Sequence, residues 1–399
     1  MQTTLFGYGK TNAAIAKRFG NCEIFDDKFK QVETFGENNK LLPMDLFDPD
    51  KSTMEVVSPG IAPSHPQVKR AKNLISEYDL FCECSPFSIW ISGTNGKTTT
   101  TEMVGLLLKN KGAIIGGNIG APLAELDMEA KIWALETSSF TLHYTTRARP
   151  NIYALLPITP DHISWHGSFE AYETAKLKPL RWLAEGELAI IPAKYRHIPT
   201  KAFVCYYENN DDLTNFFDID ATRIKFQGCF LQDALIALGI AKALFDETDY
   251  NLLNSFVVDK HKIEEFFDKS GRLWIDDSKA TNYDATLQAI EIYKDRLIHL
   301  ILGGDDKGAD LTPLFDRLKD MRVVIYAIGS NRDRIIKMAQ ERNIEAVLCG
   351  FLDIAVAKIA DRLDKNGVAL LSPAAASLDQ FSGYKERGEL FKKYVGDLN

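Results

Sequence analysis

Apolar and polar positions in the first part of the chain alternate as they do in α/β proteins. Residues 3–6 form a short apolar run, residues 12–19 have helical spacing after two glycines, and residues 22–25 form a second apolar run. A strand, a glycine turn, a helix and a second strand in this order open many nucleotide-binding folds. The pattern therefore predicts a Rossmann-like parallel sheet near the amino terminus.

Three apolar runs in the middle of the chain, residues 87–91, 131–135 and 151–156, each lead into a polar or glycine-rich turn. Because the carboxyl ends of parallel strands meet at one edge of a sheet, the side chains of these turns come together. We therefore expect Lys97, Glu136 and His162 at the same edge of a second sheet.

The last part of the chain alternates regularly between apolar runs and helical segments. The expected strands are residues 273–276, 297–302, 322–328, 345–348 and 367–371. Strands that alternate with helices of ten or more residues predict a parallel, doubly wound sheet. The turns after three of these strands are expected to form one binding rim; they are residues 277–282, 303–308 and 372–377.

Length and composition fit a multidomain enzyme. A chain of 399 residues exceeds the size at which a single hydrophobic core stops growing. We predict three domains, residues 1–87, 88–258 and 259–399. The fold class is α/β, with a Rossmann-like amino-terminal domain, a central phosphate-loop ATPase domain and a doubly wound, Rossmann-like carboxy-terminal domain.

Charge and cysteine content narrow the range of partners. A formal net charge of −8 argues against a broad nucleic-acid surface, and six cysteines without Cys-x-x-Cys spacing argue against a zinc site or a disulfide framework. The chain has neither the pattern of a signal peptide nor an apolar run long enough to cross a bilayer. We expect a cytoplasmic monomer that binds small molecules.

The strongest motif is Gly93-Thr94-Asn95-Gly96-Lys97-Thr98-Thr99, between a predicted strand and a predicted helix. Such a turn wraps phosphates with its backbone N–H groups, while Lys97 would neutralise phosphate charge and Thr98 would ligate Mg²⁺. The full phosphate-loop pattern asks for a glycine where this chain has Ile91. A loop shortened by two residues would still place the lysine and the threonine, so the motif predicts ATP binding.

Other features have less specific interpretations. Gly7 and Gly9 suggest a dinucleotide site, with an acid after the second strand, but Asn12 replaces the third glycine of that fingerprint and weakens an NAD interpretation. A single loop histidine such as His162 is more often solvated or capping than a ligand. Lys176 lies within an expected helix from residue 169 to about residue 183, and from the pattern alone it reads as a solvated surface lysine.

Nine blocks in this order resemble the Mur ligase family. They are Ser58-Pro-Gly-Ile-Ala, the phosphate loop, Gly117-Asn-Ile-Gly, Leu135-Glu-Thr-Ser-Ser-Phe, Asp161-His162, Tyr172 through Lys176, Asp277-Ser-Lys-Ala-Thr-Asn, Gly303-Gly-Asp-Asp-Lys and Ser372-Pro-Ala-Ala-Ala-Ser-Leu-Asp-Gln-Phe. The resemblance spans nearly the whole chain. The seventh and ninth blocks, which begin at Asp277 and Ser372, point to the member of the family that adds D-glutamate.

The resemblance implies a reaction that joins a carboxylate to an amine in peptidoglycan precursor synthesis. ATP would phosphorylate the carboxylate of UDP-N-acetylmuramoyl-L-alanine, and D-glutamate would attack the acyl phosphate. Lys97, Glu136, His162 and Lys176 would be the catalytic residues. Mg²⁺ ions would be held by Thr98 and Glu136 and by His162 with Lys176, the position that the family carbamylates.

The resemblance also implies three sets of binding residues. Beyond the phosphate loop, Asp233, Lys262, Asp277 and Lys279 would face ATP. The UDP-substrate would contact Lys10, Thr11, Asp27, Lys28, Ser58, Gly60, Asn118 and His162, and D-glutamate would contact Thr281, Lys307, Ser377, Leu378 and Tyr384.

Three of these positions depart from the family pattern, since Asp233 replaces an Asn, Lys262 an Arg and Tyr384 a Phe. Lys262 keeps the positive charge of an arginine but loses its two-pronged hydrogen bonding.

Three alternatives stay open at this point. One is another member of the same family, including a folate polyglutamate ligase. The second is a phosphate-loop switch without ligase activity, although the predicted set of Glu136, His162 and Lys176 speaks against it. The third is an NAD oxidoreductase with its cofactor at Gly7 and Gly9. Because the phosphate loop and the amino-acid rim belong to separate predicted domains, domain closure is expected.

Overall fold

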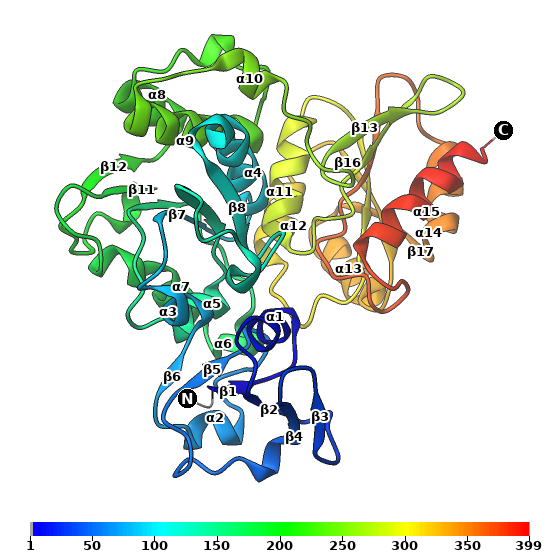
Figure 1. The fold of residues 1–399 in the computed structure, drawn as a ribbon. Coiled ribbons are helices and arrows are strands. Elements are labelled where there is room, and N and C mark those ends of the chain that lie inside the picture. Colours follow the sequence, from blue (N-terminus) through cyan, green and yellow to red (C-terminus); the bar gives the residue numbers. More distant parts are fainter. Residues whose placement is uncertain (1–2, 399) are drawn as a thin grey trace. The chain divides into compact units, whose positions relative to one another are not determined.

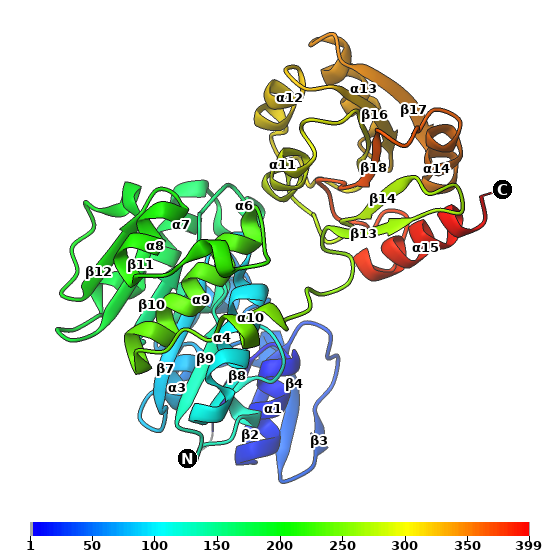
Figure 2. The same ribbon diagram turned by 90° about the horizontal axis from the view of Figure 1, so that it is seen from above.

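The computed structural model describes residues 3–398, and the chain divides into two compact units, Met1–Phe256 and Val257–Asn399 (Figures 1 and 2). It contains three six-stranded sheets, two in the first unit and one in the second. All three are parallel or mostly parallel, so the predicted α/β class is confirmed. The predicted domain boundaries at residues 87 and 258 remain predictions.

The first sheet has the strand order β3-β4-β2-β1-β5-β6. Its parallel strands are β1 (Thr3–Phe6), β2 (Cys22–Asp26), β4 (Asn39–Pro43), β5 (Glu55–Val57) and β6 (Leu74–Ile75), and β3 (Glu33–Phe35) pairs antiparallel with β4. The helices are α1 (Lys10–Phe19), α2 (Pro66–Arg70) and α3 (Glu77–Phe81). The strand, helix and strand expected at the start of the chain are all present.

Asn12 explains why the third glycine of a dinucleotide fingerprint is absent. Its side chain is fully buried, and its amide nitrogen donates to the carbonyl oxygens of Phe6 (2.8 Å) and Gly7 (2.9 Å). The amide thus satisfies backbone oxygens at the end of β1. At the end of β2, Asp26 accepts a hydrogen bond from the N–H of Tyr8 (2.6 Å), so its carboxylate stabilises the glycine turn.

The second sheet is entirely parallel, with the order β12-β11-β10-β7-β9-β8. Its strands are β7 (Phe87–Ser92), β8 (Ala113–Gly117), β9 (Ile132–Glu136), β10 (Ile152–Leu155), β11 (Leu188–Pro192) and β12 (Phe203–Tyr207). The helices are α4 (Lys97–Leu108), α5 (Ser139–Tyr144), α6 (Ile163–His166), α7 (Phe169–Leu177), α8 (Asn210–Phe217), α9 (Cys229–Phe245) and α10 (Tyr250–Asn254).

The helix that was expected from residue 169 to about residue 183 ends earlier. The α-helical part stops at Leu177 and continues as a single 3₁₀ turn over Lys178–Arg181. Pro179 lies in that turn, and a proline ring has no N–H to donate to the preceding helical turn. The strands β7, β9 and β10 are adjacent in the sheet, which confirms the expectation that their carboxyl ends share one edge.

The first two sheets share a hydrophobic core. One contiguous cluster contains Leu5, Ile24 and Val56 from the first sheet and Trp133 and Tyr153 from the second. Residues up to Phe256 therefore form one compact unit even though they carry two sheets.

The second unit contains the third sheet, with the order β13-β14-β18-β15-β16-β17. Its strands are β13 (Glu264–Phe267), β14 (Leu273–Asp276), β15 (Ile298–Leu302), β16 (Val323–Ile328), β17 (Glu345–Gly350) and β18 (Val368–Leu371). The helices are α11 (Tyr283–Ile292), α12 (Thr312–Leu318), α13 (Arg332–Gln340), α14 (Leu352–Ala360) and α15 (Tyr384–Gly396).

This sheet is doubly wound, as predicted. Side chains of α11, α12 and α13 pack into one core cluster with β14, β15 and β16, and side chains of α14 and α15 pack into a second cluster. The antiparallel edge strand β13 was not predicted. All six cysteines are free thiols, and no helix within residues 3–398 has the length and apolar character needed to span a membrane.

Candidate active site

The phosphate-loop sequence forms a tight turn between β7 and α4. Gly93 has a φ of +144° and Gly96 a φ of +84°, both in the region that favours glycine. A methyl group on Gly93 would lie 2.4 Å from Cβ of Leu156, so only glycine fits there. Ile91 is fully buried inside β7, opposite Glu136 and Ala154 of the neighbouring strands. The strand therefore extends through the position of the missing glycine, and the loop is shorter.

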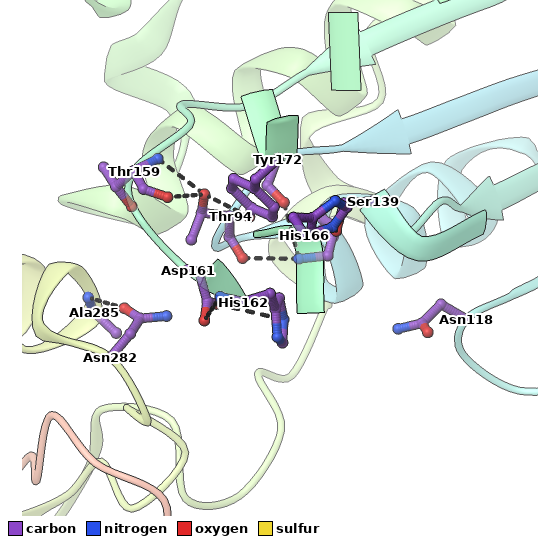
Figure 3. Close-up of polar contacts among 12 residues, drawn as sticks. Thr94, Asn118, Ser139, Thr159, Asp161, His162, His166, Tyr172, Asn282 and Ala285 are labelled. Carbon is purple, nitrogen blue, oxygen red and sulfur yellow. Dashed lines mark hydrogen bonds and ion pairs between the residues drawn. The ribbon is translucent and has the colours of Figure 1, made fainter. Parts of the chain in front are cut away.

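Lys97 is the first residue of α4, and its side chain bends back over the loop. The ammonium group donates to the carbonyl oxygens of Gly93 (3.0 Å) and Thr94 (2.8 Å). Thr94 in turn joins the loop to the chain after β10. Its hydroxyl donates to the carbonyl oxygen of Thr159 (3.0 Å) and lies 3.0 Å from the hydroxyl of Tyr172 (Figure 3). A cation is thus held at the mouth of the loop, where phosphate oxygens would meet it.

Glu136 ends β9 and joins two other parts of the same edge. Its carboxylate is buried and accepts from the hydroxyl of Thr98 (2.7 Å) and from the side-chain amide of Asn118 (2.6 Å). A carboxylate and a hydroxyl at this spacing are the hard oxygen ligands that Mg²⁺ takes in proteins. These residues fit a magnesium site beside the phosphate loop.

Lys176 is buried, so the surface interpretation drawn from the pattern alone is wrong. Its ammonium nitrogen lies 2.7 Å from the carbonyl oxygen of Gly93 and 4.9 Å from the centre of the Tyr172 ring. Burial, with Lys97 as a second cause, lowers the pKa of Lys176 well below the usual lysine value. The helical face that carries Lys176 packs against the sheet, since the hydroxyl of Tyr153 donates to its backbone oxygen (2.5 Å).

His162 lies on the same edge and has a left-handed backbone, with a φ of +52°, immediately before α6. Its ring packs at 4.6 Å from the Phe140 ring, and its Nε2 atom lies 3.6 Å from a carboxylate oxygen of Asp161. The side chain is 44% exposed, so the ring can reach a ligand. The structure therefore brings together Lys97, Thr98, Glu136, His162 and Lys176, as expected.

Sequence reasoning missed a hydrogen-bonded pair beside these residues. The hydroxyl of Ser139, at the start of α5, lies 3.0 Å from Nε2 of His166, at the end of α6 (Figure 3). Burial lowers the pKa of His166 to about 3, with His143 and His162 as further causes. The only signal in the sequence is the spacing of four residues between His162 and His166, which is typical of neighbours on one face of a helix.

Six of the predicted UDP-substrate residues lie at the carboxyl edge of the first sheet, whereas Asn118 and His162 belong to loops of the second. Lys10 follows β1 and its ammonium group donates to the carbonyl oxygen of Gly120, in the loop after β8 that also carries Asn118. The neighbouring Thr11 is half-buried in α1. This edge therefore adjoins the loop that contacts Glu136.

After β2, Asp27 accepts from Nε2 of His65 (3.0 Å), and the ammonium group of Lys28 donates to the carbonyl oxygen of Tyr8 (2.8 Å). After β5, Ser58 is buried and its carbonyl oxygen closes a turn around Gly60. The predicted residues thus follow three adjacent strands.

Asp233 lies on α9, directly against the phosphate loop. Its carboxylate accepts from the hydroxyl of Thr100 (2.9 Å), and a methyl group on Gly96 would lie 2.5 Å from the same oxygen. Within the loop Thr99 is buried, and Asn95 is half-buried. The carboxylate of Asp233 therefore packs against the phosphate loop at Gly96 and accepts a hydrogen bond from Thr100 in the helix that follows the loop.

In the second unit, Asp277 follows β14 and is buried. Its carboxylate accepts from the hydroxyl of Ser372 (2.7 Å) and the N–H of Ile263 (3.2 Å), and burial raises its pKa to about 7. Lys262 lies between two residues with left-handed backbones, His261 (φ +64°) and Ile263 (φ +51°). Strain of this kind in a β-branched residue is rare outside functional segments.

The remaining predicted residues of this unit surround the carboxyl ends of β14, β15 and β18. Lys279 lies 3.6 Å from a carboxylate oxygen of Asp259. The turns after β15 and β18 are bridged by backbone hydrogen bonds between Asp305 and Ala376, which confirms that they form one rim. Around this rim Ser377 is buried, Tyr384 begins α15, and Thr281, Lys307 and Leu378 are exposed.

Arg387, on α15, was not predicted and is fully buried beneath this rim. Its guanidinium group donates to the hydroxyl (2.9 Å) and the carbonyl oxygen (2.8 Å) of Ser278 and to the carbonyl oxygen of Ala375 (3.2 Å). It therefore ties together the turns after β14 and β18. Its planar fork suits this role better than an ammonium group would.

Comparisons with known proteins agree with this arrangement. Residues 91–214 match the Mur ligase middle domain. The chain is 51% identical to the UDP-N-acetylmuramoylalanine--D-glutamate ligase of Campylobacter jejuni subsp. jejuni serotype O:23/36 (strain 81-176), over the full length of both. It is 45% identical to the ligase of the same name from Helicobacter pylori (strain HPAG1), over 99% of each chain.

Among solved structures, MurF ligase from Thermotoga maritima in complex with ADP has a similar fold, with a TM-score of 0.62 and 16% sequence identity over 98% of this chain and 94% of the other. Full-length identity of this degree to the curated relatives confirms the resemblance seen in the sequence. The chain belongs to the Mur ligase family.

Proposed function

We propose that this chain is an ATP-dependent ligase that adds D-glutamate to UDP-N-acetylmuramoyl-L-alanine through an acyl-phosphate intermediate. The observation that carries the proposal is full-length identity of 51% to a relative named for this reaction. The cluster of Lys97, Thr98, Glu136, His162 and Lys176 at one sheet edge supports it. The oxygen of a carboxylate is a poor leaving group until it is phosphorylated, and this cluster suits phosphoryl transfer.

Lys97 would bind the terminal phosphates of ATP, and its ammonium group lies over the loop, where it donates to the carbonyl oxygens of Gly93 and Thr94. Thr98 and Glu136 would hold one Mg²⁺ ion, and His162 with Lys176 a second. When bound, Mg²⁺ would neutralise the negative charges of ATP and of the acceptor carboxylate. Asp233, Lys262, Asp277 and Lys279 would complete ATP binding.

Lys176 would act as a carbamate. Its lowered pKa favours the neutral amine, whose nitrogen can form a bond to the carbon of CO₂ and release its proton. The product carries a negative charge in place of a positive one, so it could ligate Mg²⁺ instead of repelling it.

The UDP-substrate would bind at the carboxyl edge of the first sheet, and D-glutamate at the carboxyl edge of the third sheet. Lys10, Thr11, Asp27, Lys28, Ser58, Gly60, Asn118 and His162 would hold the UDP-substrate. Thr281, Lys307, Ser377, Leu378 and Tyr384 would hold D-glutamate, whose carboxylates require a cation and hydroxyl or backbone donors. We further propose a cytoplasmic monomer with domains at residues 1–87, 88–258 and 259–399.

Phosphate release from ATP tests the proposed function. Purified protein with Mg²⁺ and UDP-N-acetylmuramoyl-L-alanine should release phosphate with D-glutamate, and far less with L-glutamate, L-lysine or meso-diaminopimelate. Lys97→Ala should abolish the release. Equal activity with another amino acid would assign a different ligase of the family, and release without any amino acid would indicate a nucleotide hydrolase.

A further inference from the structure

Ser139, which is buried, and His166, which is half-buried, form a hydrogen-bonded pair for which the proposed reaction has no assigned use. Ser139 is 3% exposed and begins α5, three residues after Glu136, and the Nε2 atom of His166 lies 3.0 Å from its hydroxyl oxygen. Within residues 3–398 the Ser139 hydroxyl has no other hydrogen-bond partner. One imidazole therefore determines how this hydroxyl is oriented.

The imidazole ring of His166 is fixed in position by aromatic neighbours. It stacks on Phe140 at 5.7 Å with an interplanar angle of 23°, and meets Tyr172 edge-on at 5.3 Å and Trp165 at 4.5 Å. Its backbone is held at the end of α6 by the hydrogen bond from its N–H to the carbonyl oxygen of His162 (3.1 Å). A ring packed in this way has little freedom to turn.

The environment of the other ring nitrogen indicates which nitrogen carries the proton. The Nδ1 atom of His166 is buried and has no hydrogen-bond partner within residues 3–398. An N–H group is left unpaired in protein interiors even more rarely than an acceptor is. The proton therefore belongs on Nε2, which donates to the oxygen of Ser139. Because that oxygen accepts, the hydroxyl proton of Ser139 is free to point away from the ring.

The location of Ser139 indicates what the hydroxyl proton meets. It follows β9, at the sheet edge where Glu136 contacts Thr98 and Asn118. The packed aromatic surroundings disfavour an imidazolium ion, so His166 is poorly suited to remove the proton of Ser139 and make it a nucleophile. An orienting role remains.

We propose that His166 is a positioning residue that directs the Ser139 hydroxyl as a hydrogen-bond donor toward an anionic oxygen of the acceptor substrate. This inference deepens the proposed function and rests on it for the identity of the acceptor, UDP-N-acetylmuramoyl-L-alanine. Neither residue is required to bind ATP.

Steady-state kinetics of matched variants test the pair. Ser139→Ala removes the hydroxyl, His166→Phe keeps the ring shape but removes the donor, and His166→Gln keeps an N–H close to the Nε2 position. We expect Ser139→Ala and His166→Phe each to raise KM for the acceptor about tenfold, the effect of one hydrogen bond, with KM for ATP unchanged. His166→Gln should restore most of the affinity.

The double variant separates positioning from a general structural role. If His166 acts through Ser139, Ser139→Ala/His166→Phe should bind the acceptor no more weakly than Ser139→Ala alone. Effects that multiply in the double variant, or an unchanged KM in His166→Phe, would overturn the proposal. Thermal unfolding of each variant identifies a loss of fold.

Nitrogen NMR of the histidine side chains in the wild-type protein at neutral pH supplies a readout that needs no substrate. The His166 signals should report a proton on Nε2, and Ser139→Ala should shift the Nε2 signal. A proton on Nδ1 would overturn the proposal even in an active ligase. Conversely, an inactive wild-type protein with the proton on Nε2 would contradict the proposed function while leaving the positioning of Ser139 supported.

Discussion

The ammonium nitrogen of Lys176 lies 2.7 Å from the carbonyl oxygen of Gly93, so α7 is joined directly to the phosphate loop. Burial, with the charge of Lys97 as a second cause, lowers the pKa of Lys176 well below the usual lysine value, which favours the neutral amine. A neutral amine at this position is reactive toward CO₂, whereas a surface lysine would be protonated.

Lys176→Ala should lower kcat of the ligase reaction by at least about 100-fold, because a positioned charge next to the transferred phosphoryl group is lost. Adding a short carboxylic acid should restore part of the activity by supplying the missing anionic oxygen. Lys194→Ala, a change in a lysine whose side chain is 52% exposed, serves as the control and should leave kcat unchanged. Full activity in Lys176→Ala would contradict the carbamate.

Gly93→Ala should damage both stability and ATP binding. The new methyl group would lie 2.4 Å from Cβ of Leu156, at a φ of +144° that other residues rarely adopt. We expect a loss of about 1–3 kcal/mol in the free energy of unfolding, as for other overpacked sites. Calorimetric titration with ATP should show weaker binding. Gly396→Ala, where no atom lies within 4 Å, is the control and should leave both measurements unchanged.

Glu77 should make the first unit less stable as the pH rises. Its carboxyl is buried and its pKa is raised to about 8, mainly by that burial. In the unfolded chain it titrates near about 4.3, so between these values the folded state binds more protons and stability falls by at most about 1.4 kcal/mol per pH unit. The stabilisation by the bound proton is complete below the unfolded pKa and is lost as the pH passes about 8.

Glu77→Gln should flatten this dependence, because the amide has no proton to release. Urea unfolding followed by tryptophan fluorescence at pH 5 to 8 measures the slope. Glu129→Gln, a change in an exposed residue whose charge does not contribute to the pKa of Glu77, should leave the wild-type slope intact. An identical slope in Glu77→Gln and the wild type would mean that another group dominates.

Strand positions and the meeting of side chains at one sheet edge could be predicted from the sequence. The strands β1, β7, β14 and β16 begin within one residue of the expected positions, because apolar runs between glycine turns are a local signal. The convergence of Lys97, Glu136 and His162 also followed from the rule that parallel strands share their carboxyl edge. These inferences required no knowledge of packing.

Features that depend on tertiary contacts were missed. The family resemblance named Lys176, but its burial could not be predicted from the pattern, because only the position of α7 against the sheet makes it a buried amine. The pair of Ser139 and His166 joins residues 27 positions apart, and no periodicity reports such a contact. Arg387 was missed for the same reason, since its partners lie up to 109 positions away.

Arg387→Met should destabilise the second unit by at least about 1–3 kcal/mol, because buried oxygens of Ser278 and Ala375 lose their donor. It should also raise KM for D-glutamate, since these turns carry the predicted binding residues. Arg387→Lys keeps the charge without the planar fork and should recover only part of the loss. Unfolding curves and D-glutamate kinetics measure the two effects, and wild-type values in Arg387→Met would exclude the proposed role.

The core shared by the first two sheets limits how this enzyme can be recombined with its relatives. A chimera joined near residue 87 would pair Leu5, Ile24 and Val56 of one parent with Trp133 and Tyr153 of another, so both sides of the seam would have to be redesigned. A chimera joined at Phe256 would keep the packing inside each compact unit of its own parent. We therefore expect that the second unit can be exchanged between relatives at Phe256, whereas an exchange at residue 87 would disrupt the shared core.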